Sequence, residues 1–151
     1  MAHEQSFVMV KPDGVQRRLI GELISRLERK GLQLVAMKML QIDDPLAAKH
    51  YEEHQGKPFY PYLMKFITSS PVIASVWQGE NAIATIRKLM GPTGLDKAEP
   101  GSIRGDYALC TTLNLMHASD SPASAAREIP LFFTPKEILN YATPTEQWLC
   151  L

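Results

Sequence analysis

The chain of 151 residues has little cysteine and no net charge. Its two cysteines, Cys110 and Cys150, do not form the closely spaced pairs of zinc sites, and one pair is too few for a disulfide scaffold. Lysine plus arginine and aspartate plus glutamate number 16 each, so the formal net charge is zero. This balance argues against a nucleic acid or an anionic membrane recognised through overall charge. Any anion-binding site must therefore be local.

The sequence also lacks long apolar runs. None approaches the roughly 18 residues of a membrane span. Polar and charged residues begin at His3 and Glu4, unlike a secretory signal peptide. The hydrophobic content of 45% and the charged content of 21% are ordinary for a soluble globular protein. We therefore expect one domain, residues 1–151, that works in the cytoplasm with no membrane partner and no specific nucleic-acid partner.

Alternating strand and helix signals predict the fold class. Short apolar runs predict strands at 6–10, 32–40, 72–77 and 113–118. Helical spacing of apolar residues, with turn residues at the ends, predicts helices at 19–27, 45–54, 62–67, 81–90 and 121–128. This order matches a split βαβ arrangement. We expect a ferredoxin-like α/β sandwich, an α+β fold in which helices flank a four-stranded antiparallel sheet.

Two segments have no regular signal that fills them. Residues 91–113 form a long connection rich in proline and glycine, and loops of that length are uncommon in compact domains unless functional or disordered. The tail, 130–151, carries Phe132, Phe133 and Trp148. Chain ends usually fray, so an apolar tail indicates docking on this subunit or on a neighbour.

The stretch 114–120, Asn-Leu-Met-His-Ala-Ser-Asp, is the first candidate site. It places His117 at the end of a predicted strand and just before a helix, for which Ser121 is a favourable N-cap and Pro122 a favourable first residue. The positive end of a helix dipole favours a neutral imidazole and offers backbone donors to an anion. A neutral imidazole is a nucleophile and phosphate is an anion. The alternative is a structural histidine that ends a strand.

Known phosphate-binding loops are missing. Neither Gly-x-x-x-x-Gly-Lys-Ser/Thr nor a Gly-x-Gly-x-x-Gly after a strand occurs, so separate side chains would have to hold a nucleotide. Arg87 lies near a helix end and Arg104 lies inside the long connection, although each alone could be a solvated surface charge. The cations near predicted element ends are Lys11, Arg17, Arg18, Arg87, Lys88 and Arg104.

A rival motif occurs at 50–54, where His-Tyr-Glu-Glu-His fits His-x-x-Glu-His. On one helix, His50 and His54 would lie one turn apart with Glu53 beside them, as in inverted zinc peptidases. A third ligand would be needed, and Glu128 lies downstream. The simpler interpretation is two exposed histidines on a charged helix face.

Three segments together resemble the nucleoside diphosphate kinases. They are Lys-Pro-Asp-Gly-Val-Gln-Arg at 11–17, Pro-Gly-Ser-Ile-Arg-Gly-Asp at 100–106, and Asn-Leu-Met-His-Ala-Ser-Asp at 114–120. The last corresponds to the family signature Asn-x-x-His-Gly-Ser-Asp. The resemblance extends from residue 6 essentially to the C-terminus. Three separate matches in the right order are much more specific than any one of them.

The resemblance implies transfer of the terminal phosphoryl group of a nucleoside triphosphate to a nucleoside diphosphate by a ping-pong route. His117 would be the nucleophile, phosphorylated on one ring nitrogen. A phosphoramidate keeps a high transfer potential, so the group can move on to a second nucleotide. Glu128 matches the carboxylate that holds the other nitrogen. From spacing alone, Asp120 competes for that role.

The remaining roles also follow from the resemblance. Lys11 and Asn114 match residues that contact the sugar hydroxyls, and Lys11 also reaches the transferred phosphoryl group. Tyr51 matches a hydroxyl that donates near the same group. These matches imply a mixed set of charged and neutral donors around the phosphate chain.

A phosphate clamp, a base platform and a metal complete the implied site. Arg87, Thr93 and Arg104 match the clamp, where charge-assisted hydrogen bonds contribute roughly 1.5–3 kcal/mol each. Phe59 matches the aromatic ring on which the base stacks, so little base selectivity is expected. Mg²⁺ would bridge phosphate oxygens, and Asp120 would touch it through water.

Substrates, assembly and two departures from the family pattern complete the expectations. The substrates would be ATP, GTP, ADP, GDP and their deoxy forms, and the assembly a homo-oligomer, a hexamer rather than a tetramer. The alternative is a non-catalytic nucleotide-binding or scaffold protein on the same fold. Ala118 replaces the signature glycine, which is nearly silent if its φ is negative. Arg18 stands where family members often have glycine.

Overall fold

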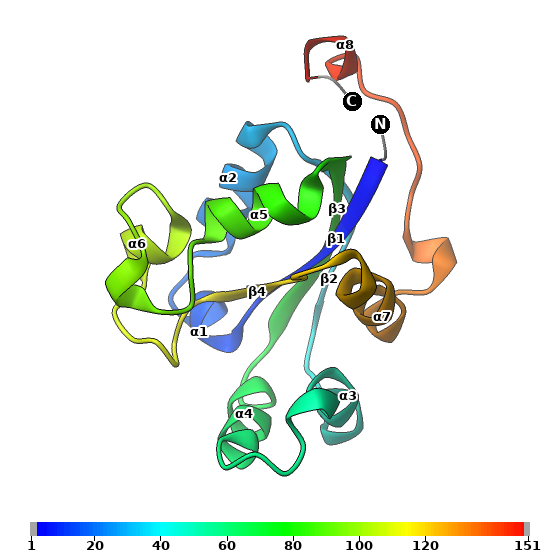
Figure 1. Cartoon of the computed structure of the whole chain (residues 1–151). Coiled ribbons are helices and arrows are strands. Elements are labelled where there is room, and N and C mark those ends of the chain that lie inside the picture. Colours follow the sequence, from blue (N-terminus) through cyan, green and yellow to red (C-terminus); the bar gives the residue numbers. More distant parts are fainter. Residues whose placement is uncertain (1–2, 150–151) are drawn as a thin grey trace.

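A four-stranded antiparallel sheet with helices on both faces forms the centre of the computed structural model, which describes residues 3–149 (Figure 1). The strands are β1 (His3–Val10), β2 (Gln33–Leu40), β3 (Val72–Glu80) and β4 (Met116–Ala118). They lie in the order β2-β3-β1-β4, and every neighbouring pair is antiparallel. This confirms the predicted ferredoxin-like sandwich.

Eight α-helices connect and cover the strands in the described part of the chain. They are α1 (Pro12–Gln16), α2 (Ile20–Lys30), α3 (Asp44–His50), α4 (Tyr60–Ile67), α5 (Ala82–Met90), α6 (Ile103–Tyr107), α7 (Pro122–Phe132) and α8 (Glu146–Leu149). Short 3-10 helices lie at η1 (Glu52–His54), η2 (Leu95–Lys97) and η3 (Pro135–Glu137). Between residues 3 and 149, none of the helices has the length and apolar character needed to cross a bilayer.

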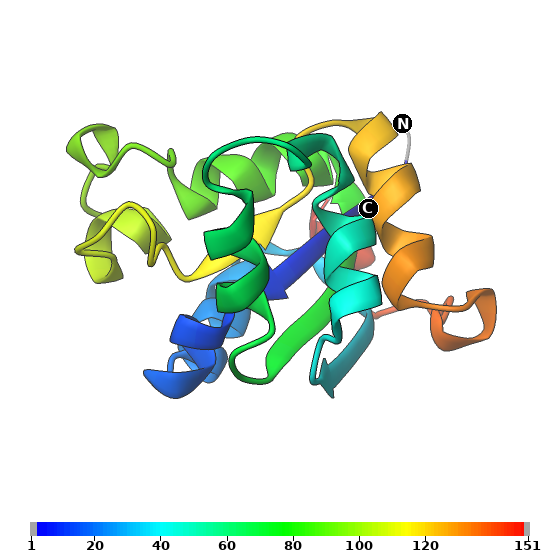
Figure 2. The same ribbon diagram turned by 90° about the horizontal axis from the view of Figure 1, so that it is seen from below.

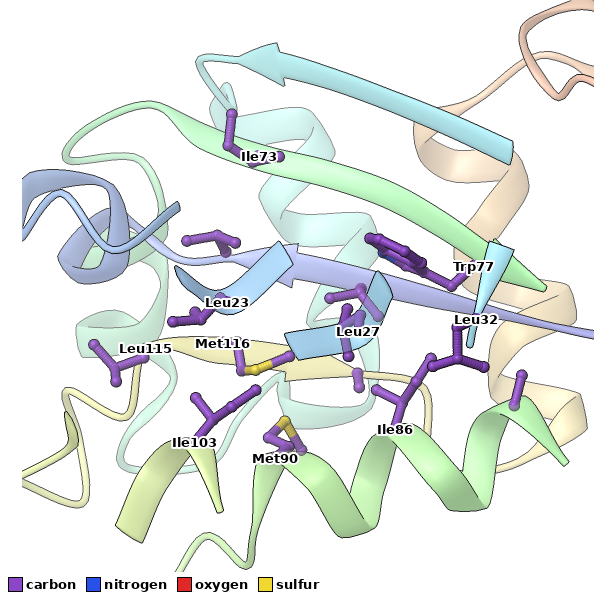
Figure 3. Close-up of a cluster of buried hydrophobic side chains, with 14 residues drawn as sticks. Leu23, Leu27, Leu32, Ile73, Trp77, Ile86, Met90, Ile103, Leu115 and Met116 are labelled. Atoms are coloured by element: carbon purple, nitrogen blue, oxygen red, sulfur yellow. The ribbon is translucent and has the colours of Figure 1, made fainter. Parts of the chain in front are cut away.

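Helices α2 and α5 cover one face of the sheet and enclose an apolar cluster (Figures 1 and 3). Successive strand residues point to opposite faces, so Val8 and Val10 of β1 point into this cluster. The buried Trp77 indole donates to Ser75 Oγ at 2.9 Å, which satisfies its polar atom. The labelled side chains of Figure 3 are Leu23, Leu27, Leu32, Ile73, Trp77, Ile86, Met90, Ile103, Leu115 and Met116.

Helices α3, α4 and α7 cover the opposite face (Figure 2). There Phe7 and Met9 of β1 pack against Ala47 of α3, Ile67 of α4 and Phe132 of α7. The central strand β1 is therefore buried on both faces, which explains why it is a continuous apolar run rather than an alternating one. The α3 and α7 helices on this face bring their side chains beside β4, where His117 lies.

The observed elements differ from the predicted ones at several ends. The helix expected at 45–54 ends at His50, and the chain continues as the 3-10 turn η1. Helix α7 runs past residue 128 to Phe132 although it contains the exposed Pro130, which lacks the N–H that a helical residue donates to the carbonyl four residues earlier. Strand β4 begins only at Met116, because the residue before it has a φ of +79°, which is incompatible with a strand. The helices α1, α6 and α8 were not expected.

Both departures from the family pattern have a backbone explanation. The described residues with positive φ other than glycine are Arg18, Asn81 and Leu115. Ala118 is therefore not in the left-handed region, which confirms that alanine at this position causes no backbone strain. Arg18 has a φ of +60°, a conformation that glycine adopts without the steric cost of a side chain.

The tail follows the outer edge strand β2. Leu139 donates its N–H to Val35 O at 2.9 Å, and the Tyr141 hydroxyl donates to Leu34 O at 2.6 Å. Phe133 is buried, whereas Trp148 is 78% exposed. The predicted docking therefore holds for part of the tail on this subunit, and Cys150 and Leu151 lie outside the described residues.

Candidate active site

His117 on β4 and Glu128 on α7 form the centre of the site. Ser121 caps α7 by accepting from the N–H of Ser124 at 3.1 Å, so this helix begins where the sequence predicted. His117 Nε2 lies 2.5 Å from Glu128 Oε2. The competing carboxylate, Asp120, instead accepts from the Ser124 hydroxyl and lies at the surface.

The Glu128 carboxylate is buried but hydrogen-bonded at both oxygens. Its second oxygen, Oε1, accepts from Ser119 Oγ at 2.8 Å. Burial alone would raise the pKa of Glu128, but the bonds from His117 and Ser119 outweigh it, and the net pKa is lowered. From the sequence we expected Ser119 to be structural; its contact to Glu128 could not be read from the sequence, because it appears only after folding.

The ionised Glu128 determines which nitrogen of His117 is free. An ionised carboxylate only accepts hydrogen bonds, so His117 Nε2 carries the proton. In the neutral ring the lone pair then lies on Nδ1. Beside this ring is a cavity of about 170 Å³, whose lining includes Tyr51, His54, Asp120 and Arg127. The arrangement leaves a nucleophilic nitrogen available next to a polar cavity.

Lys11 and Arg104 bring two positive charges to one neutral side chain, Asn114. Asn114 Oδ1 accepts from Lys11 Nζ at 2.8 Å and from Arg104 at 3.3 Å. Burial and then the neighbouring Arg104 lower the pKa of Lys11 to about 8. Burial and then Arg87 lower the pKa of Arg104 to about 10. Asp13 raises both pKa values, but burial and the neighbouring cations outweigh it, so the pair is suited to binding an anion.

The turn that begins at Lys11 is hydrogen-bonded to the segment just before β4. Asp13 Oδ2 accepts the N–H of Leu115 at 3.0 Å, and Lys11 donates its N–H to Leu115 O at 2.9 Å. Gly14 packs directly on this carbonyl, since a Cβ there would lie 2.9 Å from Leu115 O. These contacts hold Leu115 in its left-handed conformation, which directs Asn114 toward Lys11.

The remaining predicted clamp residues lie around the same segment. Arg104 donates to Gly91 O at 3.2 Å and reaches Thr93 Oγ1 at 3.5 Å. Arg87, on the last turn of α5, donates to Ala118 O at 3.4 Å, next to His117. Of the six predicted cations, the structure thus brings Lys11, Arg87 and Arg104 to β4 or the segment before it, whereas Arg17 donates to Tyr107 O.

A run of rings connects His117 to Phe59. The ring centroids lie 4.9 Å apart between His117 and His50, 4.7 Å between His50 and Tyr51, 6.0 Å between Tyr51 and His54, and 5.5 Å between His54 and Phe59. Burial raises the pKa of Tyr51 to about 12, so its hydroxyl remains protonated and can donate. Phe59 is 46% exposed, and Lys57 Nζ lies over its ring at 5.7 Å from the centroid.

The His-x-x-Glu-His motif does not form the zinc-peptidase arrangement. His50 ends α3 and is buried against His117, whereas His54 lies in η1, half-buried, with Nδ1 3.3 Å from Lys57 Nζ. The simpler interpretation, two exposed histidines on one helix face, is also wrong. In the described chain, the group of three metal-ligating side chains that lie together is His50, His117 and Glu128.

Comparisons with known proteins identify the family. Residues 4–138 match the family profile described as nucleoside diphosphate kinase. A nucleoside diphosphate kinase of Listeria monocytogenes serotype 4b is 57% identical over 97% of this chain and 99% of the relative. The chain belongs to the nucleoside diphosphate kinase family. A nucleoside diphosphate kinase of Carboxydothermus hydrogenoformans is 54% identical over 97% of this chain and 98% of the relative.

Solved structures of nucleoside diphosphate kinases share the whole fold. A halophilic enzyme from Halobacterium salinarum in complex with CDP superposes with a TM-score of 0.95 and 48% identity, over 98% of this chain and 99% of that one. A family protein from Babesia bovis gives a TM-score of 0.94 at 42% identity, over 97% and 99%. The chain is therefore a phosphotransferase of this family, which transfers the terminal phosphoryl group of a nucleoside triphosphate to a nucleoside diphosphate.

Proposed function

We propose that this phosphoryl transfer proceeds through Nδ1 of His117. The observation that supports it best is the His117–Glu128 contact of 2.5 Å, because the ionised carboxylate holds the protonated Nε2 and leaves the lone pair of the neutral ring on Nδ1. The Nδ1 lone pair forms a bond to the terminal phosphorus while the bond from phosphorus to the bridging oxygen breaks. The nucleoside diphosphate leaves with that electron pair, and a second diphosphate later reverses the step.

In this proposal Glu128 stabilises the charge that develops on the ring. When Nδ1 attacks, the imidazole becomes more positive, and the ionised carboxylate at Nε2 opposes that charge in a buried setting. The Ser119 bond to Oε1 keeps the carboxylate oriented and ionised. Glu128 does not need to take the proton, so the pair acts mainly by orientation and electrostatics.

We assign the phosphate chain to the cations around β4. Lys11 contacts the transferred phosphoryl group, and Lys11 and Asn114 contact the sugar hydroxyls. Arg87, Thr93 and Arg104 clamp the remaining phosphates. The crowding that lowers the pKa values of Lys11 and Arg104 supports this role, because a bound anion would relieve it.

The aromatic side of the site takes the base and one phosphoryl oxygen. Tyr51 donates its hydroxyl near the transferred group, and the exposed ring of Phe59 stacks against the base. Stacking without base-edge hydrogen bonds discriminates little between bases. We therefore propose ATP, GTP, ADP, GDP and their deoxy forms as substrates.

Mg²⁺ fits the oxygen side of this site. Asp120 is exposed at the cavity that His117 lines, and hydrogen bonding from Ser124 lowers its pKa, so a hard anionic oxygen is available. Asp120 would hold the ion through water. When bound with the nucleotide, Mg²⁺ supplies neutralisation of the phosphate charge.

We further propose that the chain acts as one kinase domain over residues 1–151, in a homohexamer in the cytoplasm. Leu109 and Leu113, in the long connection, are 97% and 42% exposed, which supports their burial between subunits. Measuring the mass of the native assembly in solution distinguishes the hexamer from a tetramer.

Initial-rate kinetics test the proposed route. With ATP and a second nucleoside diphosphate varied together, a ping-pong enzyme gives parallel double-reciprocal lines. His117→Ala should lose this activity while it still binds ADP. Intersecting lines for the wild type would contradict the covalent route, and binding without turnover by the wild type would favour the scaffold alternative.

A further inference from the structure

His50 is a well-placed group that the proposed reaction does not use. Its side chain is 5% exposed, and its Nδ1 is buried without a hydrogen-bond partner. Its ring packs at right angles to His117, and it lies edge-on to Phe7 and Phe132 at 6.4 and 5.6 Å. Buried polar atoms are nearly always hydrogen-bonded, so an unpartnered nitrogen beside the nucleophile needs a partner of another kind.

Three ligand atoms converge at this point. One nitrogen each from His50 and His117 and one oxygen of Glu128 all lie within 4.8 Å of one another. Ligand atoms of a tetrahedral zinc ion, bound at about 2.0–2.1 Å, lie about 3.3 Å apart. Small ring and carboxylate rotations can therefore bring the three atoms to coordination distance. Two histidines and one glutamate are also the ligand set of zinc sites that keep an open fourth position.

We propose that a divalent transition-metal ion, with Zn²⁺ as the representative, binds reversibly between His50, His117 and Glu128 and blocks phosphoryl transfer. Two imidazole nitrogens favour Zn²⁺ over Mg²⁺, which prefers oxygen ligands. When the ion binds Nε2, the proton between His117 and Glu128 moves to Nδ1, so the ring remains a neutral ligand.

An ion bound to either ring nitrogen of His117 blocks phosphoryl transfer. An ion on Nδ1 removes the lone pair that attacks phosphorus. An ion on Nε2 replaces the contact with Glu128. Arg127 lines the same cavity as His50, His117 and Glu128, so its positive charge opposes a bound cation. The site therefore suits a reversibly bound inhibitory ion rather than a permanently bound one. Binding rests on geometry alone, and only the inhibition rests on the proposed role of His117.

Zinc binding by the nucleotide-free, magnesium-free protein tests the inference. Equilibrium dialysis should give one Zn²⁺ per wild-type chain. His50→Phe keeps a ring in the aromatic pocket but removes the ligand, and should weaken the affinity about 100-fold. The matched control is His54→Ala, which removes the other imidazole of the same motif and should leave the affinity unchanged. Co²⁺ on the wild type should give the visible absorption of four-coordinate nitrogen and oxygen ligation.

Several results would overturn the inference. They are unchanged zinc affinity in His50→Phe, loss of affinity in His54→Ala, or a Co²⁺ spectrum of the six-coordinate ion. The spectrum uses the wild type, so it decides even if His50→Phe does not fold. The proposed function is tested separately. Zinc should prevent phosphorylation of the wild type until a chelator is added. If the wild type can be phosphorylated at His117 but its unphosphorylated form binds no zinc, only the metal site is contradicted.

Discussion

Ser119 Oγ accepts the N–H of Phe7 at 3.1 Å and donates to Glu128 Oε1 at 2.8 Å, which ties the central strand to the carboxylate that holds His117. All three groups are buried around a single hydroxyl. The hydroxyl thus links the sheet to the imidazole through one carboxylate.

Removing this hydroxyl should reduce both stability and activity. Ser119→Ala leaves Glu128 Oε1 and the Phe7 N–H without their partner, and a buried polar group that loses its partner costs about 1–3 kcal/mol. Urea denaturation measures the loss. The control is Ser6→Ala, whose buried hydroxyl makes only a weak 3.4 Å contact to Phe7 O and should cost less. Equal losses for the two variants would show that the hydroxyl of Ser119 has no special role.

Glu128→Gln should slow phosphorylation of His117 without preventing nucleotide binding. The amide oxygen can still accept from Nε2, so orientation is largely kept, but the negative charge that opposes the developing positive charge is lost. We expect the rate of phosphorylation to fall about 100-fold. Single-turnover labelling measures it, with ADP affinity as the control. A rate within about threefold of the wild type would contradict an electrostatic role.

Nucleotide affinity should decrease in alkaline solution because of Lys11. Its pKa of about 8 in the free protein means that the positive charge is present below pH 8 and is lost as the pH rises through that value. A bound phosphate favours the charged form, so ADP affinity should fall about tenfold per pH unit just above pH 8. Titration calorimetry measures the ADP affinity from pH 7 to pH 9.5, a range that spans the pKa of Lys11. In Lys11→Met the affinity should be lower and should not show this decrease. The same decrease in the variant would assign it to another group.

Two glycine-to-alanine substitutions should change the stability of the fold in opposite directions. At Gly14 a Cβ would lie 2.7 Å from Val10 Cγ1 and 2.9 Å from Leu115 O, so Gly14→Ala should destabilise the fold by about 1–3 kcal/mol and displace Lys11 and Asn114. At the helical Gly21 nothing lies within 4 Å, so Gly21→Ala should stabilise it by about 0.5–1 kcal/mol. Thermal unfolding and ADP affinity are the measurements. A neutral Gly14→Ala would contradict the packing of this turn on Leu115.

The fold was predictable because its signals are local. Apolar runs and helix-ending glycines, such as Gly31 with its φ of +105°, mark the strands and helices directly. The left-handed Leu115 was not predictable, because a bulky residue adopts that conformation only under tertiary contacts, here from Asp13 and Lys11. The residue that shortens β4 is thus the one that aims Asn114.

The site was partly predictable for a different reason. The resemblance identified Glu128 as the carboxylate that holds His117, whereas residue spacing alone left Asp120 as an equal candidate. Of these two carboxylates, Glu128 is the one that contacts His117 in the structure. The position of His50 relative to His54 depends on where α3 ends. One more helical turn would have carried His54 on the same helix, as the motif suggested, but the chain turns at Tyr51 instead.

The most direct test of the account identifies the phosphorylated atom. The wild-type protein is incubated with Mg²⁺ and ATP labelled on the terminal phosphate, digested in base, and its phosphoamino acids are compared with standards. If Nδ1 of His117 is the nucleophile, the label is acid-labile Nδ1-phosphohistidine, is absent from His117→Ala, and is released as labelled GTP when GDP is added. Label on Nε2, or on a residue other than His117, would contradict it.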